Sequence, residues 1–289
     1  MNRYALFGLG LLSLAASPAL ADEAYFGYVY GSETLAKGQT EAELWATDRR
    51  GKGEGHYDAQ NYRLELEHGF TNRLSVAGYA NFVSHHVRGL EPDIENLHRN
   101  FAFQGLSAEF KYNLLSPYKD GIGLTLYAEP GWSRIHSVEG KKGTEYELEL
   151  KALLQKNFLD DRLIWATNFT FEPEWERDRQ IDPVSGIAKT EWEKELKLEV
   201  TSGLAYRLGS GWYAGVEGRY ASIYPNWTEG LHRKAYAVSA GPSIHYGAKR
   251  WWVTATYLPQ WFGSPSPGGS LNYGEFEKRE LRLKVGYEL

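Results

Sequence analysis

The sequence predicts an all-β fold, a transmembrane antiparallel up-and-down β-barrel of about twelve strands. Three observations predict it. Apolar and polar residues alternate with a period of two through most of the chain after residue 38, which is the pattern of a strand with one apolar and one polar face. Short and long connections alternate strictly between these stretches, as they do in membrane barrels. No stretch beyond the first 21 residues approaches 18 consecutive apolar residues, so the sequence predicts no membrane helix.

The first six strands are expected over residues 40–46, 62–67, 74–82, 106–112, 124–132 and 145–154. In the first, Glu41, Glu43 and Trp45 alternate with threonine, alanine and leucine, and in the second two glutamates and an arginine alternate with tyrosine and leucine. The third, after a tight turn, has an apolar face that ends in phenylalanine. In the fourth and fifth, polar residues alternate with leucine, alanine and aromatic residues. The sixth is the clearest, because three glutamates and a lysine alternate with tyrosine, alanine and three leucines.

The last six strands are expected over residues 163–175, 192–206, 212–220, 236–246, 251–261 and 281–289. Tryptophan, phenylalanine, leucine, valine and tyrosine recur on one face of each. The eighth strand sets three glutamates and a lysine against that face. The twelfth alternates strictly from Leu281 to Leu289. An even number of strands places both termini of the chain on one side of a membrane.

The connections fall into two classes of length. Short ones are expected near 69–73, 114–121, 157–161, 207–211 and 247–250. Longer, more charged ones are expected near 48–56, 83–102, 133–143, 176–190, 221–234 and 262–276. Aromatic residues also gather at both ends of the apolar faces, as expected for the two interfaces of a bilayer. The pattern therefore predicts short periplasmic turns and longer external loops.

The N-terminus reads as a secretory signal peptide over residues 1–21. Arg3 is followed by an apolar stretch that is too short to span a membrane, and Ala19-Leu-Ala21 is an A-x-A cleavage site. Residues 22–37 are expected to form a periplasmic N-terminal segment, which can also fold into the lumen, and residues 38–289 the barrel. The chain has no cysteine, which excludes disulfides, thiol catalysis and thiolate metal sites.

Several segments carry a family resemblance. The stretch from Leu281 to Leu289 resembles the terminal strand signal of bacterial outer-membrane barrels, although that signal ends in an aromatic residue and this chain ends in leucine. Residues 28–45 resemble the opening of an uncharacterised family of porin-like outer-membrane barrel proteins, and residues 67–74 resemble a turn common to many such barrels. Residues 240–260 are similar to the same group. The resemblance implies a bacterial outer-membrane location, lipid contacts and recognition of residues 281–289 by the barrel assembly machinery.

The inward phase of the predicted strands is acidic. The residues expected to line the lumen are Glu41, Glu43, Glu65, Glu109, Glu129, Glu147, Glu149, Glu195, Glu217, Arg63, Lys111, Arg219 and Arg282. Because excess carboxylates stabilise cations in a confined pore, the first hypothesis is a narrow, cation-tolerant channel for small polar solutes. The alternative is a salt-bridged, plugged barrel that acts structurally or adhesively through its external loops.

Two other interpretations stay open. Outer-membrane phospholipase A resembles this protein in being a twelve-strand barrel, and Ser84, His86 and Asn100 are candidates for a lipid hydrolase site because a base near a hydroxyl can activate it. In this chain the serine precedes the histidine, the reverse of that family. His85, His86 and His98 suggest an external metal site, although loop histidines are usually solvated. We expect no cofactor, and the absence of a basic stripe argues against nucleic acid as a partner.

Overall fold

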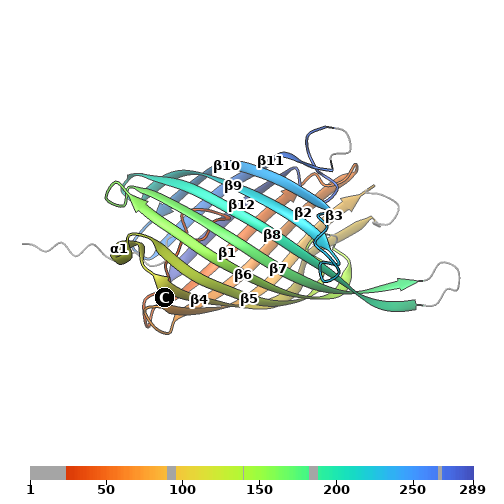
Figure 1. Ribbon diagram of the computed structural model, residues 1–289, viewed down its shortest axis with the longest axis horizontal. Coiled ribbons are helices and arrows are strands. Elements are labelled where there is room, and N and C mark those ends of the chain that lie inside the picture. Colours follow the sequence, from red (N-terminus) through yellow and green to blue (C-terminus); the bar gives the residue numbers. More distant parts are fainter. Residues whose placement is uncertain (1–23, 90–95, 139, 182–187, 266–268) are drawn as a thin grey trace, which may run out of the picture.

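The computed structural model describes residues 24–89, 96–138, 140–181, 188–265 and 269–289. These described residues form twelve strands and one short helix, and the strands close into a single antiparallel barrel (Figure 1). The strands are β1 (Thr40–Arg50), β2 (His56–Gly69), β3 (Leu74–Arg88), β4 (Leu97–Leu115), β5 (Gly123–Ile135), β6 (Lys142–Phe158), β7 (Leu163–Ile181), β8 (Ala188–Gly209), β9 (Trp212–Pro225), β10 (Ala235–Gly247), β11 (Trp251–Ser264) and β12 (Arg279–Glu288). The predicted fold class is confirmed.

Each strand pairs with its neighbours in the chain, and β1 pairs with β12 to close the barrel. In that closing pair Leu44 lies opposite Val285 and Glu43 lies opposite Gly286. Closure leaves no strand with an unpaired edge, which is what lets a sheet cross a bilayer. Among the residues that the structure describes, no helix has the length and apolar character needed to cross a membrane.

The two ends of the barrel differ. At one end, which we call the turn end, short connections join the strands, and helix α1 (Pro117–Asp120) lies between β4 and β5. The opposite end, which we call the loop end, carries the longer connections, and β7 and β8 extend beyond the other strands there (Figure 1). Several strands run further toward the loop end than the alternation predicts, because polar residues such as Thr47 and Arg49 continue the strand pairing.

The wall has an apolar outer face and a polar inner face. On β2, Leu64 is 47% exposed, whereas the adjacent Glu65 is 5% exposed. The same contrast recurs around the barrel, with leucine, valine and aromatic side chains outside and glutamate, lysine and threonine inside. Strand residues point alternately to the two faces of a sheet, so the period of two in the sequence becomes two surfaces of opposite character.

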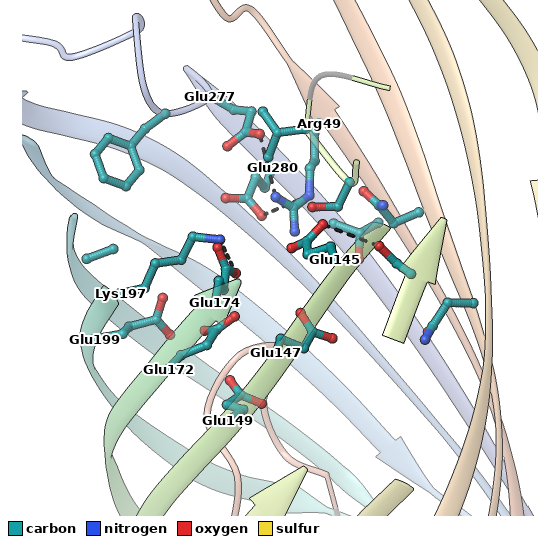
Figure 2. Close-up of a pocket in the computed structure, with 18 of the residues that line it drawn as sticks. Arg49, Glu145, Glu147, Glu149, Glu172, Glu174, Lys197, Glu199, Glu277 and Glu280 are labelled. Carbon is teal, nitrogen blue, oxygen red and sulfur yellow. Dashed lines mark hydrogen bonds and ion pairs between the residues drawn. The ribbon is translucent and has the colours of Figure 1, made fainter. Parts of the chain in front are cut away.

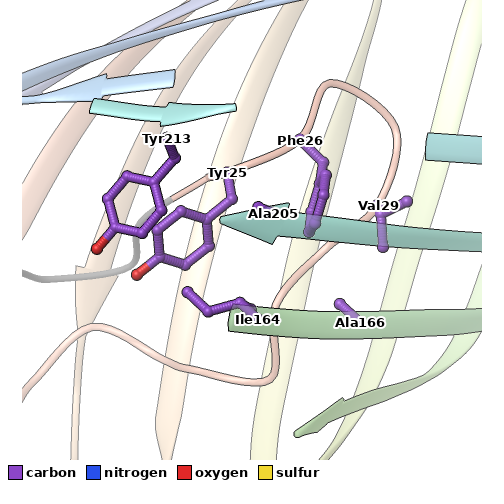
Figure 3. Close-up of a cluster of buried hydrophobic side chains, with 7 residues drawn as sticks. All are labelled: Tyr25, Phe26, Val29, Ile164, Ala166, Ala205 and Tyr213. Atoms are coloured by element: carbon purple, nitrogen blue, oxygen red, sulfur yellow. The ribbon is translucent and has the colours of Figure 1, made fainter. Parts of the chain in front are cut away.

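Residues 24–37, which we call the luminal segment, lie inside the barrel at its turn end. Tyr25, Phe26 and Val29 pack in a buried cluster against side chains from β7, β8 and β9 (Figure 3). Phe26 contacts Gly203 so closely that a Cβ there would lie 2.6 Å from its ring. The last residue of the segment, Lys37, donates its N–H to Asn72 Oδ1, in the turn between β2 and β3, at 3.0 Å. The segment therefore fills the turn-end half of the lumen.

Candidate functional site

Inward polar side chains satisfy the backbone of the luminal segment. Asn168 on β7 accepts a hydrogen bond from Tyr30 N at 2.7 Å and donates one to Tyr30 O at 2.9 Å. Ser32 N donates to Gln155 on β6 at 2.8 Å, and Ser32 O accepts from Asn113 on β4 at 2.7 Å. A buried backbone without such partners would lose several hydrogen bonds to water, so these side chains hold the segment in place.

Charged residues hold the middle of the segment. Glu217 on β9 accepts hydrogen bonds from Gly27 N at 2.9 Å and Tyr28 N at 2.8 Å. Arg282 on β12 donates to Gly27 O at 3.0 Å, and its guanidinium lies 3.9 Å from the centre of the Tyr28 ring. The Tyr28 hydroxyl donates to Glu280 at 3.0 Å. Burial raises the pKa of Tyr28, and the nearby Glu280 carboxylate raises it further. The phenol therefore stays protonated and keeps its hydrogen bond to Glu280.

Beyond the luminal segment, toward the loop end, lies a cavity of about 310 Å³, which we call the vestibule. One side of it is formed by carboxylates, which we call the acidic wall (Figure 2). The acidic wall consists of Glu145, Glu147 and Glu149 on β6, Glu172 and Glu174 on β7, and Glu199 on β8.

Strand register explains why these carboxylates gather. Glu145, Glu147 and Glu149 occupy alternate positions of β6 and so share its inner face. In the pairing with β7, Glu147 lies directly opposite Glu174. Like charges directly opposite each other in a sheet destabilise it, so these positions are not explained by strand stability.

The acidic wall is only partly neutralised. Lys197 pairs with Glu174, and Lys151 Nζ lies 2.8 Å from Glu149. Glu147, in contrast, has no ion pair with any described residue, although it lines the cavity. The vestibule therefore holds more negative than positive charge on this side and can attract cations.

The facing side of the vestibule contains arginines that already have partners. Arg63 pairs with Glu129, and Arg219 pairs with Glu280. Arg49 Nη1 lies 3.5 Å from Glu277 Oε1. A dashed line marks this ion pair in Figure 2. Arg219 also lies 3.8 Å from Glu199 of the acidic wall. Because each of these guanidinium groups has a carboxylate partner outside the acidic wall, they cancel little of its charge.

The residues predicted to line the lumen lie in three places. Those at the vestibule are Glu129, Glu147, Glu149, Arg63, Arg219 and Arg282. Those buried in the turn-end half are Glu41, Glu43, Glu65, Glu109, Glu217 and Lys111. Glu195 lies further toward the loop end, opposite Glu174 in the pairing of β7 with β8.

Among the vestibule residues that the inward phase of the predicted strands does not include are Arg49, Glu174 and Glu277. Arg49 is in phase with the inward Glu43 and Thr47, so continuing the period of two by one more step finds it. Glu174 follows the inward Glu172 by two residues, but Pro173 between them obscures the strand pattern. Glu277 precedes β12 in an irregular connection, where no period exists to predict its direction.

The candidate hydrolase residues do not form a catalytic chain. The Ser84 hydroxyl accepts a hydrogen bond from Phe101 N at 2.9 Å, and Asn100 contacts His98 at 3.3 Å. No hydrogen bond joins Ser84 to His86 among the described residues, so the base does not reach the hydroxyl in this arrangement.

The histidine grouping that the sequence suggested is wrong in one member. His85 faces the lumen and is buried, with its ring contacting Ser137 O at 3.1 Å. His86 instead lies beside His56 and His98, with ring centres 5.1 and 5.3 Å away. Neighbouring strand residues point to opposite faces, which is why His85 and His86 cannot share one site.

A closed twelve-strand barrel with an apolar outer face and a charged lumen defines the class of outer-membrane β-barrel proteins. Within that class the chain belongs to the family of unknown function DUF6662, whose model matches residues 18–289. No curated protein matches the sequence.

Solved structures support the fold. The COG4313 outer membrane channel from Pseudomonas putida F1 aligns with a TM-score of 0.57 at 12% identity, covering 89% of this chain and 98% of that one. The beta domain of the Bordetella autotransporter Brka aligns with a TM-score of 0.52 at 13% identity, covering 88% and 100%. The translocator domain of autotransporter NalP from Neisseria meningitidis gives 0.50 at 10% identity, covering 89% and 90%. At such identities the likeness concerns the fold alone.

Proposed function

We propose that the protein is an outer-membrane channel that admits small cationic or polar solutes through the acidic vestibule. The luminal segment closes its turn-end half, so passage requires this segment to move. The observation that supports the proposal most directly is the excess of carboxylates around the vestibule. The luminal segment lies next to this cavity and is not a strand of the barrel, so it can move without breaking the sheet.

The proposed setting follows from the fold and the sequence. In this proposal a cleaved signal peptide over residues 1–21 directs export, and the barrel then inserts into the bacterial outer membrane with the turn end in the periplasm. Outer-membrane lipids cover the apolar face, and the assembly machinery recognises residues 281–289. The vestibule then faces the outside of the cell.

Selectivity comes from the acidic wall in this proposal. Fixed carboxylates in a narrow aqueous space raise the local concentration of cations and lower that of anions. Glu147 is the residue with most influence, because it lines the cavity and has no ion pair with a described residue. Glu149 and Glu174 contribute less, since lysines neutralise them.

A reversible disulfide between the luminal segment and the barrel wall tests whether the segment closes the channel. A Cβ at Gly123 would lie 2.8 Å from Ser32 Cβ, somewhat closer than the roughly 3.8 Å typical of a disulfide. The chain has no native cysteine, so only an introduced pair can form a disulfide. We expect Ser32→Cys combined with Gly123→Cys to conduct less in a planar bilayer when oxidised, and to recover when a thiol reductant is added.

The controls are Ser32→Cys alone and Gly123→Cys alone, which cannot form the disulfide and should not respond to reductant. Equal conductance in the oxidised and reduced double variant would show that the luminal segment does not control passage. Silence of the unmodified chain across all voltages would favour the alternative that the luminal segment itself supports, a plugged barrel acting through its loops.

A further inference from the structure

A second group of carboxylates lies in the turn-end half of the lumen, away from the vestibule. The pairing of β1 with β2 puts Glu43 directly opposite Glu65, and Glu41 directly opposite Glu67. Two successive pairs of like charge in one ladder destabilise the sheet unless something neutralises them.

Three of these side chains converge. One carboxylate oxygen from each of Glu43, Glu65 and Glu67 lies within 4.8 Å of the other two. The three residues are 8%, 5% and 0% exposed, respectively. Water therefore solvates this negative charge poorly, and a positive partner is needed nearby.

Among the described residues, two of the three have a positive partner in ion-pair contact. Glu43 accepts a hydrogen bond from Trp45 Nε1 at 2.6 Å and lies 3.7 Å from Lys284 Nζ. Glu67 lies 3.0 Å from Lys111 Nζ.

Glu65 is different. It has no hydrogen bond or ion pair with any residue that the structure describes, and its shielded Oε2 is unsatisfied. An uncompensated buried carboxylate is costly, and this one points into a cluster whose other two members hold further oxygen atoms. The unsatisfied oxygen is the observation that points to a bound cation.

We propose that Glu43, Glu65 and Glu67 bind a hard divalent cation of the calcium class. All the protein ligands are carboxylate oxygens, which suit calcium and magnesium rather than softer metals. Calcium tolerates irregular geometry and accepts water for its remaining positions, whereas magnesium demands a near-ideal octahedron. The site is distinct from the vestibule and does not depend on whether the barrel conducts.

The cation also connects to the luminal segment. Trp45 donates to Glu43, and its ring lies 6.1 Å from that of Tyr30, measured between centres. Occupancy of the site fixes Glu43 and therefore Trp45, against which Tyr30 packs. Binding should stabilise the luminal segment in the lumen.

Terbium luminescence tests the site. Tb³⁺ replaces Ca²⁺ at oxygen sites and emits when a nearby indole is excited, and Trp45 contacts one of the proposed ligands. We expect the folded full chain in detergent to give sensitised emission that Ca²⁺ competes away. Glu65→Gln should weaken Tb³⁺ affinity by about tenfold or more, the loss typical of a removed metal-site group.

The matched control is Glu147→Gln, the same change in the other convergent group, Glu145, Glu147 and Glu174. It should leave the Trp45-sensitised site intact. Equal loss in both variants, or no loss in either, would overturn the proposal. So would an absence of Tb³⁺ binding accompanied by a protonated-carboxyl infrared band that disappears in Glu65→Gln, since the cluster would then hold a proton. Circular dichroism checks that each variant is folded.

Discussion

The two halves of the lumen are built from the same strands but have different interiors. In the turn-end half, the inward side chains contact the backbone and the aromatic rings of the luminal segment. Glu217 and Asn168, for example, accept hydrogen bonds from its backbone amides. In the loop-end half, the same strands border an open cavity, and Glu147 has no ion pair with a described residue. An alternating strand pattern thus produces either a packed interior or a solvated one, depending on what the chain places beside it.

The two halves therefore contain carboxylates of two kinds, those that hold the luminal segment and those that border the cavity. A carboxylate that is bonded to the luminal segment has a clear role in holding it. A carboxylate that borders water without a partner adds little to stability, and its charge is available to solutes. Substitutions in the two halves should therefore differ in what they change, and the following four are ordered from the largest expected effect on stability to the smallest.

Arg63→Met should be the most destabilising, because it leaves the buried Glu129 without its ion-pair partner. Breaking a buried pair typically costs about 3–5 kcal/mol. The free energy of unfolding, measured by urea titration in lipid vesicles, checks this. The double variant with Glu129→Gln should recover much of the loss, and failure to recover would show that Arg63 acts mainly by packing on Tyr79.

Glu217→Ala should loosen the luminal segment by about 2–3 kcal/mol, since charged hydrogen bonds to two backbone amides are lost. Hydrogen exchange at the Gly27 and Tyr28 amides should accelerate, while exchange in β1 stays slow. Glu217→Gln keeps a carbonyl acceptor and should have a smaller effect. Unchanged exchange in the alanine variant would show that the aromatic cluster alone holds the segment.

Gly203→Ala should displace Phe26, because the new methyl group would lie 2.6 Å from its ring. Overpacking of this kind costs about 1–3 kcal/mol. Proteolysis of the luminal segment in the folded protein measures the displacement. Gly218→Ala is the control, since its Cβ would meet its nearest neighbour at 3.7 Å, an ordinary contact. Equal protection of both variants would mean that the ring shifts aside without releasing the segment.

Glu147→Gln should change stability by less than about 0.5 kcal/mol, the range of substitutions without a lost partner. It should reduce cation preference, measured as the reversal potential in a salt gradient across a planar bilayer. Glu54→Gln, an exposed position on the connection between β1 and β2, should leave both quantities unchanged. A reversal potential that moves equally in both variants would exclude the acidic wall as the source of selectivity.

The barrel could be predicted from sequence because its rule is local. Each strand reveals its two faces through every second residue, as Glu145, Glu147 and Glu149 do on β6, and no long-range information is needed. The site could be predicted only in part. The direction of Glu147 follows from the period, but its lack of an ion pair depends on which lysines lie on the neighbouring strands.

The contacts of the luminal segment could not be predicted from any local pattern in the sequence. Residues 24–37 have no strand period, and their partners come from strands throughout the barrel. An aromatic and glycine-rich stretch before the first strand was compatible with a periplasmic segment or with one inside the lumen. Only the three-dimensional arrangement shows that Asn168 and Gln155 hold its backbone.

The position of the luminal segment has a consequence for the order of folding. Its residues precede β1, yet Gly27 contacts Arg282 on β12, 255 positions later in the chain. The docking surface is complete only after the last strand has joined the first. Contacts of such long sequence separation form slowly, because the intervening chain must be arranged first. The segment should therefore be among the earliest parts of the chain to be synthesised and among the last to reach its final place.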